Sequence, residues 1–158
     1  MDAIEVDLMR PTEYGRLYYQ PNAEIEPFVL FVQNGLKIKR TFSINIDSAI
    51  ILDLNENQII QAIEFVIHKK VWKIDPKLTP PHPEIEADIR VINISNRYES
   101  IETPVRSFTN EKYQYVFFDW GREDNDKKWV YLSEQCCALV TDKSLVGFFI
   151  SLASNNAK

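Results

Sequence analysis

The sequence predicts a mainly β protein, in the form of a tandem duplication of a small antiparallel β-sheet unit. Apolar side chains recur at every second residue along much of the chain, and β-branched and aromatic residues dominate these stretches. No window of a dozen residues shows the i, i+3, i+4, i+7 apolar spacing of an amphipathic helix. Short helical turns over residues 10–19 and 100–108 stay open, so an α+β fold with short helices is the alternative.

Four short segments recur in the same order, which is the evidence for duplication. Each pair combines similar residue types, and the second member follows the first by 81 to 86 residues. The pairs are 4–8 with 85–89, 31–35 with 117–121, 42–46 with 128–132, and 59–63 with 144–148. Because order and spacing persist over most of the chain, we interpret the sequence as two copies of a unit of about 80 residues.

A proline-rich segment marks the boundary between the two copies. Four of the eight prolines lie within residues 75–83. Proline fixes φ and lacks an N–H donor, so neither a helix nor a central strand can run through this segment. We therefore predict a first repeat at 1–74, a linker at 75–83, a second repeat at 84–153 and a tail at 154–158. Whether the two repeats form one compact domain or two stays open.

Strands are expected in pairs within the first repeat. Residues 28–33 and 36–46 flank Asn34-Gly35, the dipeptide that best accepts the two positive φ angles of a type I′ turn, so a two-residue hairpin is predicted there. Residues 49–54 and 59–67 flank a polar turn and predict a second, closing hairpin.

The second repeat carries the same signals with different loops. Residues 113–120 and 127–132 flank a longer charged loop, at the place where the first repeat has Asn-Gly. Residues 135–140 and 145–152 flank the turn 141–144 and predict the same closing hairpin.

Composition narrows the classes of function. The net charge of −5 and pI of about 5.1 argue against a nucleic-acid or anionic-membrane partner, since phosphate binding needs clustered Lys and Arg. The longest apolar run, 145–150, is too short to span a bilayer, and residues 1–5 lack a positively charged leader. The adjacent Cys136 and Cys137 are expected to be reduced, as in an intracellular protein. We expect a soluble cytoplasmic protein and leave homo-oligomerisation open.

No motif predicts catalysis, a metal or a cofactor. Asp53 and Glu64 stand at the first and twelfth positions of a calcium-loop pattern, but Gln58 occupies the position that needs Gly, and the flanking residues read as strands. His68 and His82 lack partners at metal-ligand spacing. Glycine-rich phosphate loops and nucleophile elbows are absent from the sequence. We therefore expect no catalytic residues and consider an enzyme the less favoured class.

The favoured hypothesis is a small binding protein that docks a basic partner, such as an immunity or antitoxin-like protein. Its predicted surface combines an aromatic anchor with the charged loop, because aromatic rings supply most interface energy and charge sets the association rate. The residues are Trp120, Glu123, Asp124 and Asp126.

The alternative is a small-molecule-binding or enzymatic domain with its site between the two repeats. Clefts between packed units commonly hold ligands. In this hypothesis the proline-rich linker roofs the cleft, which is lined by Trp72, His82, Trp120 and Asp119.

The end of each repeat resembles the closing hairpin of a small bacterial family of uncharacterised proteins, in which an acidic turn leads into a Val-Gly-Ile-Glu-type strand. The matching residues are 55–64 and 142–150, with Ala62 in place of the glycine and Phe149 in place of the glutamate. The resemblance implies a small β-rich unit without an established activity, and it supplies no catalytic residues.

Overall fold

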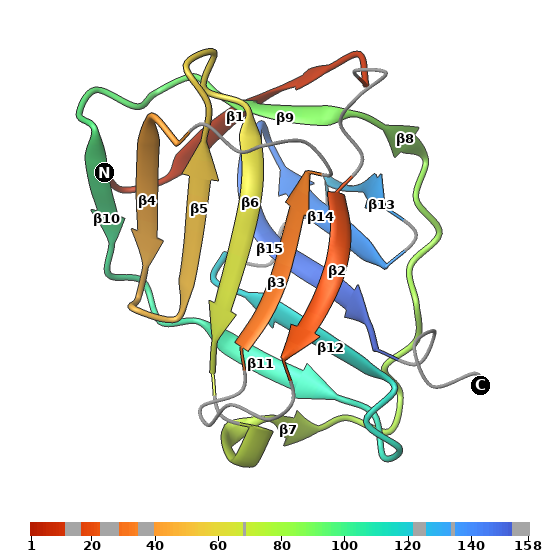
Figure 1. Cartoon of the computed structure of the whole chain (residues 1–158). Coiled ribbons are helices and arrows are strands. Elements are labelled where there is room, and N and C mark those ends of the chain that lie inside the picture. The colour runs from red at the N-terminus through yellow and green to blue at the C-terminus, as the bar shows by residue number, and fades with distance from the viewer. Residues whose placement is uncertain are drawn as a thin grey trace.

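The computed structural model shows a two-layer β-sandwich, as Figure 1 illustrates. The structure describes residues 1–11, 17–22, 29–34, 40–67, 69–121, 126–133 and 135–152, with only the backbone described for 17–22 and 29–34. The mainly β prediction is confirmed. Within these ranges the one helical element is a 3₁₀ turn, η1 (Lys69–Val71).

The first layer is a six-stranded sheet with the order β10-β4-β5-β6-β3-β2. All neighbours in it are antiparallel except β10, which runs parallel to β4. Its strands are β2 (Leu17–Asn22), β3 (Val29–Asn34), β4 (Phe42–Ile46), β5 (Ile50–Leu54), β6 (Ile60–Val66) and β10 (Tyr98–Ile101).

The second layer is a nine-stranded sheet with the order β7-β11-β12-β15-β14-β13-β8, and β1 joins it by pairing with both β15 and β9. Its central strands are antiparallel, whereas the two-residue edge strands β7 and β8 are parallel to their neighbours. The strands are β1 (Ile4–Met9), β7 (Lys73–Ile74), β8 (Ile85–Glu86), β9 (Asp88–Val91), β11 (Arg106–Thr109), β12 (Tyr115–Asp119), β13 (Lys127–Ser133), β14 (Cys136–Thr141) and β15 (Ser144–Ser151).

Both closing hairpins are confirmed, as β5 with β6 and β14 with β15. The helical turn considered over 100–108 is wrong, because β10 and β11 occupy most of residues 98–109. Of the turn considered over 10–19, residues 12–16 lie outside the described ranges, and β2 begins at Leu17. These strands are short and their apolar alternation covers only two or three residues, too few to show a period.

The predicted Asn34-Gly35 hairpin is also wrong. β3 pairs with β2 and β6, while β4 pairs with β5 and β10, so the strands on either side of this dipeptide are not neighbours in the sheet. The residues after Asn34, up to 39, lie outside the described ranges. A turn-favouring dipeptide reports local backbone preference, and here strand pairing is decided by contacts made over longer sequence separations.

The two sheets share one hydrophobic core. Phe65 of β6 stacks on Phe118 of β12 with ring centroids 4.9 Å apart, and meets Phe148 of β15 edge-on at 5.6 Å. All three side chains are fully buried. Since these contacts join residues of both sheets, the layers pack face to face in the manner of a sandwich.

The two halves of the chain share topology and register. The orders β4-β5-β6-β3-β2 and β13-β14-β15-β12-β11 are the same when counted along each half. The pair Phe31 with Glu64 corresponds to Phe117 with Phe149, and each closing hairpin carries a bulge, at Asp53/Leu54 and at Leu139/Val140. This agreement supports tandem duplication, which stays a prediction.

Residues 4–8, at the start of the first repeat, correspond to a different segment of the second repeat from the one that the sequence predicts. The Val6 N–H donates to the Lys143 carbonyl at 2.8 Å, and the Val91 N–H donates to the Gln58 carbonyl at 2.9 Å. Gln58 and Lys143 have matching positive φ angles of 66° and 64°. The counterpart of residues 4–8 is therefore 89–93 rather than 85–89.

The halves also exchange strands. β1, from the start of the chain, and β7 join the nine-stranded sheet, whereas β10, from the second half, closes an edge of the six-stranded sheet. The linker runs between β7 and β8, which lie at opposite edges of the nine-stranded sheet. This path brings the linker to the outer face of that sheet.

Candidate functional site

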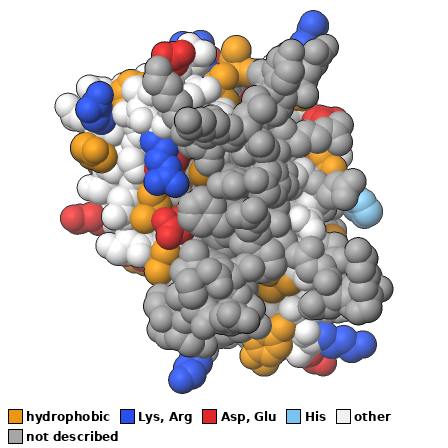
Figure 2. Space-filling view, in the orientation of Figure 1, with side chains coloured by type: hydrophobic (Ala, Val, Ile, Leu, Met, Phe, Trp, Pro, Cys, Tyr) orange, Lys and Arg blue, Asp and Glu red, His pale blue; other side chains and the backbone are white. Residues whose placement is uncertain are grey.

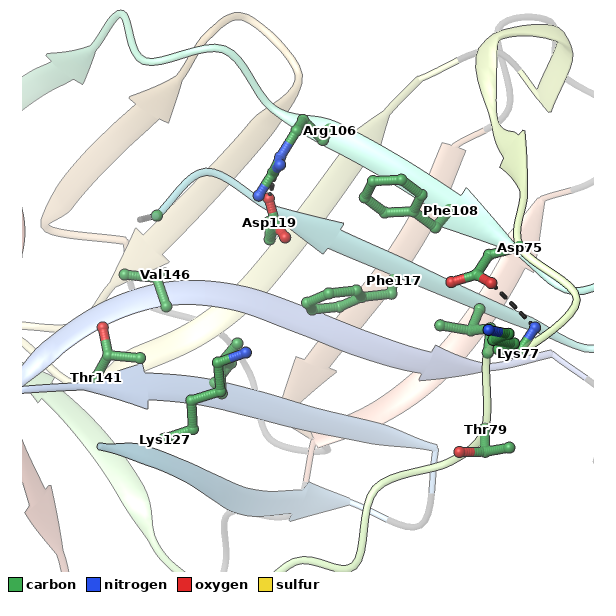
Figure 3. A pocket seen from close by; sticks show the side chains of 13 residues that line it. Asp75, Lys77, Thr79, Arg106, Phe108, Phe117, Asp119, Lys127, Thr141 and Val146 are labelled. Atoms are coloured by element: carbon green, nitrogen blue, oxygen red, sulfur yellow. Dashed lines mark hydrogen bonds and ion pairs between the residues drawn. The ribbon is translucent and has the colours of Figure 1, made fainter. Parts of the chain in front are cut away.

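A cavity of about 370 Å³ opens on the outer face of the nine-stranded sheet (Figure 3). Strand residues form its floor, and the beginning of the linker forms one wall. Its lining includes Leu78 and Thr79 of the linker, Gly121, and Leu139, Thr141 and Val146 of the closing hairpin, in addition to the aromatic and charged residues described next.

Strand alternation builds an aromatic floor. Ser107 and Phe118 are buried toward the core, so their neighbours Phe108 and Phe117 point to the opposite face. Phe108 and Phe117 are directly paired across β11 and β12, with ring centroids 6.4 Å apart and planes 29° apart. Both rings are half-buried, which leaves part of each surface open to a ligand.

A glycine in β15 makes room for this floor. A Cβ at Gly147 would lie 2.7 Å from the Phe118 carbonyl oxygen and 3.1 Å from the Phe117 ring. Any larger residue would therefore displace the ring or the neighbouring strand. Gly147 thus leaves the space that the Phe117 ring occupies beside β15.

A tight turn fixes the linker wall. The Asp75 N–H donates to the Thr109 carbonyl at 2.8 Å, which ties the start of the linker to β11. The Leu78 N–H donates to the Asp75 carbonyl at 3.1 Å, and the Lys77 N–H donates to Asp75 Oδ1 at 2.9 Å. Asp followed by Pro is typical of the first two positions of a type I turn, so the local sequence accounts for this wall.

Charged side chains surround the floor. Arg106 Nε lies 2.7 Å from Asp119 Oδ1, and the Arg106 guanidinium carbon lies 5.9 Å from the centre of the Phe108 ring. Figure 3 shows Phe117 in the middle, with this ion pair on one side, Asp75 and Lys77 on another, and Lys127 on a third. The site therefore combines an apolar floor with charged groups drawn from the linker and from three strands, β11, β12 and β13.

Of the residues expected to line a cleft between the repeats, Asp119 lines this cavity. Trp72 and Trp120 are core residues, 5% and 7% exposed, in contact with Phe118 and Phe148 respectively. His82 is exposed in the linker and does not line the cavity. The cavity also lies outside the sandwich, because the interior between the sheets is filled by aromatic and aliphatic side chains.

Trp120, the expected aromatic anchor of the docking surface, is buried in the core. Trp120 packs on Phe148 with centroids 5.7 Å apart and cannot reach a partner from its buried position. Glu123 and Asp124 lie outside the described residues. Asp126 is exposed and lines a second cavity, of about 230 Å³, whose other charged residues are Asp7, Asp142, Lys128 and Lys143.

The calcium-loop pattern forms a strand hairpin. Asp53 lies on β5 and Glu64 on β6, with the turn between them, so the helices of a calcium-binding hand are replaced by strands. Burial raises the pKa of Asp53, and Arg40, whose Nε is 3.4 Å away, and Ser43 oppose this shift. Among the described residues no group of three or more His, Cys, Asp or Glu could hold a metal ion.

The two cysteines lie on opposite faces of β14. Cys136 is in the core, and Cys137 is half-buried on the aromatic outer face. Burial raises the pKa of Cys137 to about 11, so its thiolate is scarce near neutral pH and it is a poor nucleophile.

The sequence interpretation missed most of this site. Phe108, Arg106, Lys77 and Lys127 form no local motif, because the linker and two strands, β11 and β13, bring them together from distant positions. The alternation of Tyr115, Phe117 and Asp119 was a usable signal, since it places two aromatic rings and a carboxylate on one face.

On the described part of the six-stranded face, basic and acidic side chains are interspersed and not gathered by sign (Figure 2).

Among the described residues there is no helix of the length and apolarity needed to cross a membrane. In comparison with known proteins, the sequence matches no family model and no curated protein.

Proposed function

We propose that this chain is a binding protein that holds a small ligand, or a short segment of a partner, in the cavity on the outer face of the nine-stranded sheet. The observation that carries this proposal is the linker wall, which the Asp75 turn fixes beside the paired rings of Phe108 and Phe117. A preformed concave site with an apolar floor and a few converging polar groups is the usual form of a ligand site.

The scaffold supports such a role. The floor residues Phe108 and Phe117 lie on β11 and β12 of the nine-stranded sheet, and the other face of this sheet packs in the shared core. Because the core already holds these strands in place, little conformational entropy is lost when a ligand binds the floor. The free thiols Cys136 and Cys137 support a reducing, cytoplasmic location.

The proposal can be tested with a library of small aromatic fragments and backbone amide NMR of the whole chain. Bound fragments should shift the amides of Phe117, Gly121 and Thr141 and leave those of Ile44 and Leu52, in the six-stranded sheet, unchanged. Fragments that bind only elsewhere, or a library without any hit at the cavity, would contradict the proposal.

A matched pair of variants separates the floor from general stability. Phe108→Leu removes one ring of the floor while keeping an apolar side chain, and should weaken the hits several-fold. Tyr98→Leu changes an aromatic residue that is 76% exposed and does not line the cavity. This variant should leave the affinity of the bound fragments unchanged.

A basic protein partner is a second proposal, favoured by the acidic excess around the smaller cavity, where Asp7, Asp126 and Asp142 outnumber Lys128 and Lys143. Once a native partner is identified, the Asp126→Asn, Asp142→Asn double variant should slow its association and flatten the salt dependence. Unchanged association rates would rule out this surface.

A further inference from the structure

The charges around the cavity indicate the chemical class of the ligand. We infer that the cavity takes a small anion with a planar apolar body, in which the body lies on the Phe117 floor and the anionic group is attracted by Lys77 and Lys127, which line the cavity on different sides of that ring. This inference rests on the proposed function, since it specifies the ligand of the same cavity.

The carboxylates of the cavity are already engaged. Asp119 pairs with Arg106 at 2.7 Å, and this pair leaves no net charge. Asp75 Oδ1 accepts the Lys77 N–H at 2.9 Å, inside the turn that forms the wall. The charge of Asp119 is therefore balanced by Arg106, whereas Asp75 keeps its charge and has one oxygen occupied by a backbone N–H of the turn.

Lys77 and Lys127, unlike Arg106, form no ion pair with a carboxylate within the described ranges. Lys77 comes from the linker and Lys127 from β13, and Figure 3 shows them on different sides of Phe117. In a chain with a net charge of −5, three cations and two carboxylates at one cavity make it locally basic.

The aromatic floor selects the shape of the ligand body. The Phe108 and Phe117 rings are stacked with planes 29° apart, and both are only half-buried, so a flat group can pack against the aromatic surface that faces the cavity. Offset stacking on such rings is favourable beyond simple burial of apolar area. Charge and shape thus favour the same class, an aromatic or similarly flat carboxylate.

The test uses three probes with the same ring and different charge: phenylacetate, phenylacetamide and phenethylamine. Each is titrated into the full chain, and the dissociation constant is taken from the amide shifts of Phe117, Gly121 and Thr141. Phenylacetate should bind about three- to tenfold more tightly than the amide, as expected for partly exposed ion pairs, and the amine should bind most weakly.

Variants attribute this preference to the lysines. In the Lys77→Gln, Lys127→Gln double variant, the anion should lose its advantage while the affinity for the amide stays the same. Lys112→Gln, an exposed lysine outside the cavity, is the matched control and should keep the preference. Raised salt should likewise reduce the preference in the unmodified protein.

The outcomes separate the two proposals. Equal binding of all three probes at the cavity, or tighter binding of the amine, would overturn the anionic ligand class and leave the cavity as a binding site. Absence of all three from the cavity would overturn this inference, while hits from the wider fragment library there would still support the proposed function. A preference that survives in the double variant would also overturn it.

Discussion

Truncation of Phe65 to alanine should destabilise the whole molecule, because this ring joins the two sheets. Phe65 is 1% exposed and contacts Phe118 at 4.9 Å and Phe148 at 5.6 Å. Phe→Ala in a core typically costs about 3–5 kcal/mol, which is a large part of the total of about 5–15 kcal/mol for a natural domain. Loss of two favourable ring contacts places the expected cost in the upper half of that range.

Urea unfolding is the appropriate assay, followed in parallel by tryptophan fluorescence and far-ultraviolet circular dichroism. Trp72 and Trp120 lie in the same core, so their fluorescence should report the same transition as the backbone signal. Phe65→Leu, which retains more of the apolar volume, should cost less and serves if the alanine variant does not fold. Tyr98→Ala is the control and should change stability by less than about 0.5 kcal/mol.

A loss below about 1 kcal/mol for Phe65→Ala would refute the shared core. Separate midpoints for the two signals would also refute it, because they would mean that the sheets unfold independently.

Three further predictions concern single positions. Gly147→Ala should cost about 1–3 kcal/mol in urea unfolding, because its Cβ would lie 2.7 Å from the Phe118 carbonyl oxygen; an unchanged midpoint would show that the strands give way easily. Burial raises the pKa of Asp53 above 3.8, so its contribution to stability is present at low pH and is lost as the pH rises through the raised pKa. Asp53→Asn should therefore gain stability relative to the unmodified chain between about pH 3 and pH 7, and a constant difference would contradict this. Cys137, with a pKa of about 11, should react with iodoacetamide at pH 8 about a hundredfold more slowly than in the unfolded chain; comparable rates would contradict its burial.

The β class and the closing hairpins were predictable because they depend on local signals. β5, β6, β14 and β15 are short runs of mostly apolar residues, and each turn between the strands of a hairpin is short and polar. The order in which the strands pair within each sheet was not predictable from such local signals. Asn34-Gly35 carries the strongest local turn signal in the chain, yet β3 pairs with β6, some 30 residues later in sequence.

The residues of the candidate site were hard to predict because their positions also depend on contacts between distant parts of the chain. Trp120 follows Asp119 and precedes the charged loop, which suggests exposure, but its ring packs on Phe148 of β15. The cavity exists because the linker passes beside Phe108 and Phe117, and nothing in residues 75–79 alone shows which face of which sheet they cover. Only the pairing of β7 with β11 establishes that.

Intermolecular nuclear Overhauser effects from bound phenylacetate would show directly whether the linker-walled cavity is the binding site. We expect contacts from the ring protons of the probe to the rings of Phe108 and Phe117 and to the methyl groups of Leu139. Contacts to residues of the six-stranded sheet, with none to Phe117, would contradict it.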